Sequence, residues 1–378
     1  MATPPIARPV HSRGEGARAP VVPWVVLAWS AAAVGLGLGW WSGVLPRGVP
    51  EGPSFGSLFS AAGLGVASVT VIGFGCAGAV CAVVLLRRVG GRWAQVAAWS
   101  LAAAVLLVFV DGSLLALLGY TMIVPVVGWF MPGLLSAYVS AALEPTALTL
   151  LFCAVGVVVW ALAALTHGRA VRGACRRCGR DEHWNPERER SVRARALRVG
   201  RWAVGVGVVL ALLYPALRVL WLFGVALDFG EEETRQMLSD PYVLATGLSL
   251  GSAGVVGAAL MLGLVQRWGV RFPRWTVGLA GRRVPVALAV VPASLVTVAL
   301  VAMGRSTVVQ LVIGSAGATP VTEPVHATVF ALMGVWGAAL GVATAAYAVR
   351  RRAECDGCGR GLPEVEPARG PVGPAAAG

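Results

Sequence analysis

The chain has 378 residues, of which 57% are hydrophobic and 13% are charged, and its net charge is +13. Soluble domains are about 45–50% apolar and about 25% charged, so this composition excludes an ordinary soluble domain and indicates a protein that lies in a lipid bilayer. The basic residues are all arginines, and they gather at the ends of apolar runs. That distribution orients membrane proteins, and it argues against nucleic acid as the partner of the positive charge.

Eight apolar runs are each long enough to cross a membrane, which takes about 20 mainly apolar residues per helix. Strands of a membrane barrel would alternate in character, and these runs do not, so helix is the structure that they can adopt. The runs lie at 23–45, 60–86, 94–118, 146–166, 202–226, 242–265, 284–304 and 326–348. We therefore predict an all-α fold, a polytopic bundle of eight transmembrane helices.

The segments around these runs suggest a division of the chain into five parts. Arginine and proline in residues 1–22 predict a disordered cytoplasmic tail, and residues 361–378 are expected to form a second one. Between the tails we expect a four-span unit at 23–180, a basic cytoplasmic linker at 181–201 and another four-span unit at 202–360.

Residues 119–143, between the third and fourth spans, are apolar but interrupted by Pro125, Pro132 and several glycines. Such a broken stretch is typical of an interfacial or re-entrant segment. We expect Trp129 and Phe130 to lie at the depth of the lipid headgroups, where aromatic residues are enriched.

The arginines also predict the orientation. With the N-terminus inside, the two tails and the loops after spans 2, 4 and 6 hold 27 of the 31 arginines, which predicts that both termini are cytoplasmic. A composition without lysine and rich in alanine and glycine is typical of a high-GC bacterial genome, so the expected membrane is the bacterial plasma membrane. The arginine run from Arg188 to Arg201 is suited to anionic lipid headgroups, or it serves only to fix the topology.

The second half of the chain repeats features of the first at an offset of 179 to 181 residues. Span 4 begins at Glu144-Pro145 and span 8 at Glu323-Pro324, and each is followed by a Cys-x2-Cys-Gly-Arg motif. Weaker matches pair Leu36, Trp40 and Gly43 with Leu217, Trp221 and Gly224, Gly75 and Gly78 with Gly254 and Gly257, and Arg88 with Arg267. Matches in the same order indicate duplication, although apolar helices also resemble one another by composition. Because each half has an even number of spans, the two repeats are predicted to be parallel.

The two cysteine motifs predict a metal site. Cys175 and Cys178 form the first pair and Cys355 and Cys358 the second, and two such pairs can provide the four sulfur ligands of tetrahedral zinc. The 176 residues between the pairs are too many for an ordinary zinc ribbon, but the repeat places both pairs at equivalent helix ends on one face of the membrane. The reducing cytoplasm disfavours disulfides. Separately acting thiols, a redox or iron–sulfur role, and His183 as a substitute ligand remain open alternatives.

The two Glu-Pro pairs have a structural and a functional interpretation. A glutamate and a proline both suit the start of a helix, for electrostatic and conformational reasons. Alternatively, Glu144 and Glu323 are two pseudo-symmetric carboxylates that face an outer cavity, with His326 as a partner that responds to protons.

Three charges fall within or beside the spans. Asp111 in span 3 and Arg305 near the end of span 7 occupy equivalent spans, so they can meet near the axis between the repeats, or they can extend to the membrane interface. Arg218 in span 5 follows Pro215, where we expect a kink.

The sequence YPALRVLWLFG in span 5, together with CRRCGR and CDGCGR, resembles uncharacterised integral membrane proteins of actinobacteria. That resemblance implies no activity. The sequence shows no Walker motif, no HExxH and no nucleophile elbow, so nothing in it indicates an enzyme. We expect a small-molecule permease or a membrane scaffold with a cytoplasmic zinc site, and the alternative is a membrane-bound regulatory or partner-binding protein.

Overall fold

A computed structural model describes residues 21–50, 55–130, 132–225, 241–274, 276, 278–313 and 324–363, together with residues 227, 232, 234, 235 and 239. In this part of the chain the regular structure is helical, apart from one isolated antiparallel bridge between Arg271 and Arg283. Most of the predicted tails, residues 1–20 and 364–378, lie outside the described residues, as does Glu323.

The helices follow the predicted apolar runs. They are α1 (Val21–Trp41), α2 (Phe59–Leu86), α3 (Gly91–Phe109), α4 (Ser113–Val127), α5 (Leu134–Ala142), α6 (Pro145–Val171), α7 (Pro186–Leu220), the short 3₁₀ helix η1 (Trp221–Phe223), α9 (Pro241–Gly263), α10 (Val286–Ile313) and α11 (Pro324–Arg350). Among the described residues, seven helices are long and apolar enough to cross a membrane: α1, α2, α3, α6, α7, α10 and α11. Helix α9 is also apolar, but its stretch Gly247–Gly263 is shorter than those seven. The structure thus supports a multi-pass helical membrane protein, and the eighth span stays a prediction.

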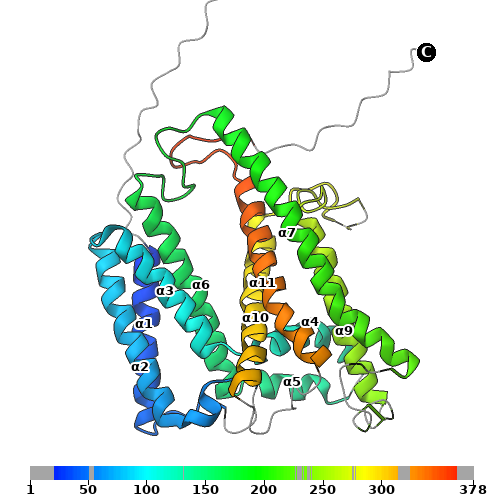
Figure 1. Cartoon of the computed structure of the whole chain (residues 1–378). Coiled ribbons are helices and arrows are strands. Elements are labelled where there is room, and N and C mark those ends of the chain that lie inside the picture. The colour runs from blue at the N-terminus through cyan, green and yellow to red at the C-terminus, as the bar shows by residue number, and fades with distance from the viewer. Residues whose placement is uncertain are drawn as a thin grey trace, which may run out of the picture.

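The long helices form two bundles that stand side by side (Figure 1). In the first bundle α1 packs on α2, α3 on α6, and α1 on α6; in the second, α7 packs on α9, α10 on α11, and α7 on α11. Each bundle has its own apolar core, and α10 also contributes Val298, Ala299 and Ala302 to the core of the first. Helix α10 therefore joins the two bundles within the expected membrane.

Matched residues pack alike in the two bundles. Trp40 and Trp221 are both buried near the ends of their helices, and the glycine three positions later has a positive φ in each case, 72° at Gly43 and 74° at Gly224. Gly75 and Gly254 lie where an added Cβ would be within about 3 Å of a backbone oxygen on the neighbouring helix. Glycine is thus needed in both places for close helix crossing.

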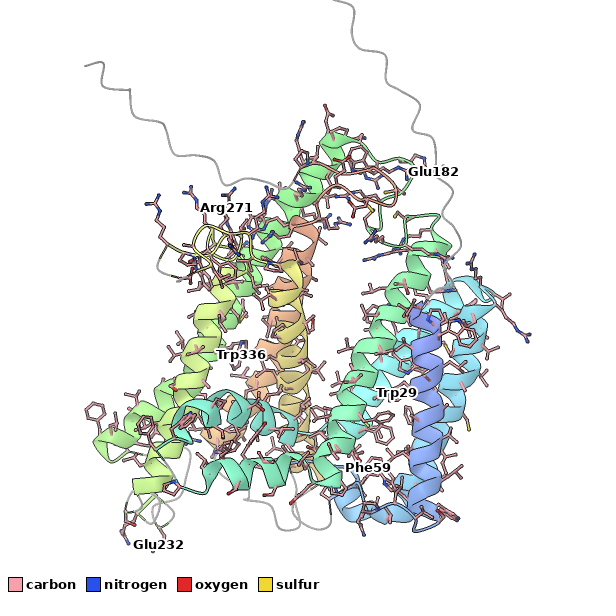
Figure 2. All side chains as sticks on the ribbon, turned by 180° about the vertical axis from the view of Figure 1, so that it is seen from behind. Trp29, Phe59, Glu182, Glu232, Arg271 and Trp336 are labelled. Carbon is pink, nitrogen blue, oxygen red and sulfur yellow. The ribbon has the colours of Figure 1, made fainter. Side chains whose placement is uncertain are left out.

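The loops separate into two ends. One end holds residues 87–90, 172–185, 264–285 and 351–363, and we call it the arginine-rich end (Figure 1). Glu182 and Arg271 mark it in Figure 2, while Glu232 lies at the opposite end. Both ends of the described chain, Val21 and Pro363, belong to the arginine-rich end (Figure 1).

The third predicted span, 94–118, is shorter in the structure. Helix α3 ends at Phe109, Val110 is extended, and α4 begins at Ser113. The Asp111 carboxylate accepts a hydrogen bond of 2.9 Å from the Ser113 amide and so supports the start of the new helix. Hydropathy alone overlooked this break because the residues on both sides are apolar.

Helices α4 and α5 run across the end of the molecule opposite the arginine-rich end (Figure 1). Helix α4 packs against α9 and α10 of the second bundle as well as α6 of the first. Beyond it, the side chains of Trp129 and Phe130 are 88% and 83% exposed, as befits the expected place at the headgroups. The predicted interfacial segment is thus two helices, and it begins at residue 113 rather than 119.

Candidate metal centre

The first cysteine hairpin follows helix α6. The Cys175 amide donates to the carbonyl of Arg180 (2.9 Å), and the Gly179 amide donates back to the carbonyl of Cys175 (2.7 Å). Gly179 has φ +77°, a left-handed conformation that glycine adopts without strain. These bonds fold residues 175–180 into a tight knuckle with both thiols on it.

The second hairpin, after helix α11, has the same hydrogen bonds. The Cys355 amide donates to Arg360 (3.1 Å), the Gly359 amide donates to Cys355 (2.7 Å), and φ of Gly359 is +66°. In both motifs, the residue after the second cysteine has a left-handed conformation, which explains why it is a glycine.

The two hairpins bring all four predicted ligands together. The sulfur atoms of Cys175, Cys178, Cys355 and Cys358 lie within 4.8 Å of one another. Across the hairpins, Cys175 Sγ is 3.9 Å from Cys355 Sγ, and Cys178 Sγ is 3.6 Å from Cys358 Sγ. Tetrahedral zinc with bonds of about 2.3 Å holds its sulfurs about 4 Å apart. The donor set and its spacing therefore fit one four-coordinate metal ion.

Among the described residues, the other candidate ligands lie outside this group. His183, the alternative ligand, is exposed and does not belong to the cluster. Of the remaining cysteines, Cys81 in α2 and Cys153 in α6 are buried, as expected for small apolar packing residues, whereas Cys76 in α2 is exposed.

Two thiols of the cluster, those of Cys175 and Cys358, differ in acidity. Burial opposes ionisation of Cys175, but hydrogen bonds from the amides of Cys178 and Arg177 outweigh it and lower its pKa to about 7. Burial and the neighbouring thiols raise the pKa of Cys358 to about 12. Metal ions bind thiolates, so an ion that enters this site must displace protons from thiols, and metal binding is therefore coupled to pH.

Arg180 connects the two hairpins. Its buried guanidinium donates to the carbonyls of Ala353 (3.0 Å), Arg360 (2.9 Å) and Arg352 (3.3 Å), all in the second hairpin region. In the other direction, Arg352 donates to Cys178 O (2.9 Å) and Arg360 to Asp181 O (2.7 Å). The hairpins are thus held against each other by arginine side chains that donate hydrogen bonds to main-chain carbonyls, in addition to the contacts between the thiols.

Glu189 balances the charge of this clamp. It forms a two-pronged ion pair with Arg180 (2.8 and 3.1 Å), and it accepts from Arg193 (3.3 Å) and Trp184 (3.2 Å). Arg193 in turn donates to the carbonyls of Leu362 and Pro363. Glu189 lies in the first turn of α7, which begins after Asn185, whose side chain caps the Arg188 amide (2.7 Å). From Pro186 onward, the predicted basic linker 181–201 is therefore continuous helix.

Asp111 and Arg305 come close but do not pair directly. The Arg305 guanidinium donates to the carbonyls of Gly56 (2.6 Å) and Val110 (3.2 Å), while its charge acts on Asp111 over a longer distance. Asp111 and Arg305 are therefore near each other, as predicted, but they form no ion pair. The hydrogen bonds of Arg305 attach α10 to the first bundle.

Asp111 and Glu144 line one cavity of about 500 Å³ at the end opposite the arginine-rich end, together with Tyr120 and Tyr138. The cavity lies between α4, α5, α6 and the chain before α2. Arg305 and His326 are not among its lining residues. Of the two predicted outer carboxylates, Glu144 therefore lines a cavity, and it shares that cavity with Asp111.

His326 and Arg218 have aromatic neighbours. The His326 ring stacks on Phe330, with 4.3 Å between ring centroids. The Arg218 guanidinium lies over the rings of Tyr214 (4.5 Å) and Trp221 (4.0 Å), and its side chain is buried. These contacts compensate the charge of Arg218 within the span.

Sequence reasoning found the four cysteines and missed the Arg180–Glu189–Arg193 network beside them. The arginine that follows each Cys-Gly pair was visible, but its buried acidic partner becomes apparent only in the folded chain. The chain matches no protein-family model, no curated protein and no solved structure at a significant level.

Proposed function

We propose that this protein is a membrane scaffold of the bacterial plasma membrane, in which one zinc ion joins two four-helix repeats on the cytoplasmic side. The observation that carries the proposal is the cluster of four thiols within 4.8 Å, two from the hairpin after α6 and two from the hairpin after α11. Four sulfur ligands leave no open coordination position, which is typical of structural zinc rather than catalytic zinc. The zinc would hold the two bundles together at the arginine-rich end, outside the membrane, where α10 does not join them.

The duplication and the orientation belong to the same proposal. The corresponding helix pairs, the glycine crossings and the two like knuckles at one end of the molecule support parallel repeats. The concentration of arginine at that end supports a cytoplasmic location for it. Anionic headgroups are the expected lipid partners of this end, and a reducing compartment would keep the thiols available to metal.

Metal analysis of the purified full-length chain tests the proposal. We expect about one zinc per chain after removal of loosely bound ions. Iron with the visible absorption of an iron–sulfur cluster, or no metal after purification with zinc in the medium, would contradict it.

A small-molecule permease is the second candidate, and the cavity lined by Asp111 and Glu144 favours it. Alternating access requires that such a cavity open to both sides of the membrane in turn. A scaffold needs no second opening. Within the described residues, no feature favours the regulatory alternative over these two.

Cysteine labelling separates the two candidates and tests the orientation. We expect a membrane-impermeant maleimide to label Glu144→Cys in intact cells and to leave Arg195→Cys, at the arginine-rich end, unlabelled. In inside-out vesicles the reagent should label Arg195→Cys. Labelling of Glu144→Cys from that side as well would favour the permease, whereas labelling from outside alone would favour the scaffold. The reverse pattern in intact cells would contradict the orientation.

A further inference from the structure

The second bundle contains a large apolar cavity at its arginine-rich end. It measures about 920 Å³ and lies between α9, α10, α11 and the loop 264–285. Its lining includes Met261, Trp268, Phe272, Pro292 and Trp336. In Figure 2, Trp336 lies midway along the bundle and Arg271 lies at the arginine-rich end, so the cavity runs from the expected membrane interior to the membrane surface.

The loop that closes this cavity is well held. Its two arms pair through hydrogen bonds from the Phe272 amide to Arg282 O and from the Val284 amide to Val270 O, each 3.0 Å. Helix α11 fixes the base of the loop, because the Tyr347 hydroxyl donates to Gly269 O (2.7 Å) and Arg351 donates to Val284 O (2.9 Å). The loop that closes the cavity at the arginine-rich end is therefore fixed by hydrogen bonds within itself and to α11.

The loop that closes the cavity carries only positive charge. The loop carries five arginines, and the sequence from residue 241 to residue 322 contains no aspartate or glutamate. The five are Arg267, Arg271, Arg274, Arg282 and Arg283. Arg350 and Arg351 at the end of α11 donate to carbonyls of the same loop and add two further charges. Anions are thus favoured at the mouth while the interior accepts only apolar groups.

We propose that this site binds an anionic phospholipid of the cytoplasmic leaflet, with an acyl chain in the cavity and the phosphate among the loop arginines. The volume lies within the roughly 300–1,000 Å³ of pockets that enclose a small ligand. Basic pockets between transmembrane helices on the cytoplasmic side are suited to acidic lipid headgroups. The loop arginines favour an anionic lipid over a neutral apolar ligand, because they can pair with its phosphate. The apolar interior favours a lipid over free phosphate, because it can enclose an acyl chain. This site goes beyond the zinc scaffold. It rests on the proposed orientation of the arginine-rich end, but its occupancy does not depend on the metal.

Native mass spectrometry of the full-length chain tests this site, after transfer from vesicles of equal parts phosphatidylglycerol and phosphatidylcholine. We expect one phosphatidylglycerol to be retained in preference to phosphatidylcholine. Removing two exposed loop charges, with Arg274→Gln and Arg282→Gln together, should weaken that retention about tenfold or more. The matched control, Arg190→Gln with Arg195→Gln on α7, removes as many charges from the same end and should change it less than twofold.

Two further arms distinguish the source of the anion and the role of the cavity. Glycerol phosphate in millimolar excess should not displace the retained lipid, because it lacks an acyl chain. Ala289→Trp, which places an indole among the cavity-lining residues, should abolish retention in protein that still elutes as a single species. Equal retention of both lipids, equal loss in the control pair, or displacement by glycerol phosphate would each overturn the proposal.

Discussion

Replacing Cys355 and Cys358 by serine is expected to reduce bound zinc from about one per chain to less than about a tenth. Both pairs are needed for four sulfur ligands, and the second hairpin supplies two of them, 3.9 and 3.6 Å from their counterparts. If zinc binds only the folded chain, a free concentration one hundred times its dissociation constant contributes about 2.7 kcal/mol of stability. The variant should therefore melt at a lower temperature in detergent, and chelation should lower the wild-type melting temperature in the same way.

The control for this change is Cys76→Ser with Cys81→Ser, which removes as many thiols from helix α2. Metal content should stay at the wild-type level, because neither residue belongs to the cluster. A single shared ion requires that losing either pair remove all of the zinc. Retention of about half of the metal in the Cys355/Cys358 variant would show instead that each pair binds its own ion with other partners.

The spans were predictable because hydropathy and length decide which segments cross a membrane. The break after α3 was missed by hydropathy, because the stretches before and after it are both apolar, although Asp111-Gly112 is itself a turn signal. Hydropathy also missed the start of α7, because its first turns, which precede the apolar span at 202–226, are charged. A helix-start signal was nevertheless present, with Asn185 at the cap and Pro186 in the first turn.

The cysteine cluster was predictable because two local motifs and an internal repeat constrain where four sulfurs can lie. The outer cavity was only partly predictable. Equivalence between repeats suggested that Asp111 meets Arg305, yet the Arg305 hydrogen bonds go to the carbonyls of Gly56 and Val110, and Asp111 lines the same cavity as Glu144. The cavity is bounded by α4 and α5, whose path across the end of the molecule does not follow from hydropathy.

The buried clamp beside the thiols predicts the second large effect. Glu189→Gln should lower the unfolding free energy by about 3–5 kcal/mol, the usual cost of leaving a buried charge without its partner. The side chains of Arg180, Glu189 and Arg193 are only 3%, 4% and 6% exposed, so water cannot replace the lost carboxylate. Burial lowers the pKa of Arg352, and the Glu189 carboxylate opposes this by favouring the charged guanidinium. One carboxylate thus compensates three guanidinium groups at the junction of the two hairpins.

Glu187→Gln is the matched control, because Glu187 lies in the same first turn of α7 and its side chain is exposed. It should change the melting temperature little, whereas Glu189→Gln should lower it by several degrees when tryptophan fluorescence is followed on heating in detergent. Zinc retention against a competing chelator should also weaken in Glu189→Gln, since Arg180 then loses the ion pair that orients it toward the second hairpin.

The double variant Glu189→Gln with Arg180→Met removes both charges of the pair. It should recover part of the lost stability but not the zinc retention, because the hydrogen bonds of Arg180 to residues 352, 353 and 360 are gone. Equal melting temperatures for Glu187→Gln and Glu189→Gln would show that the clamp contributes nothing to holding the two bundles together.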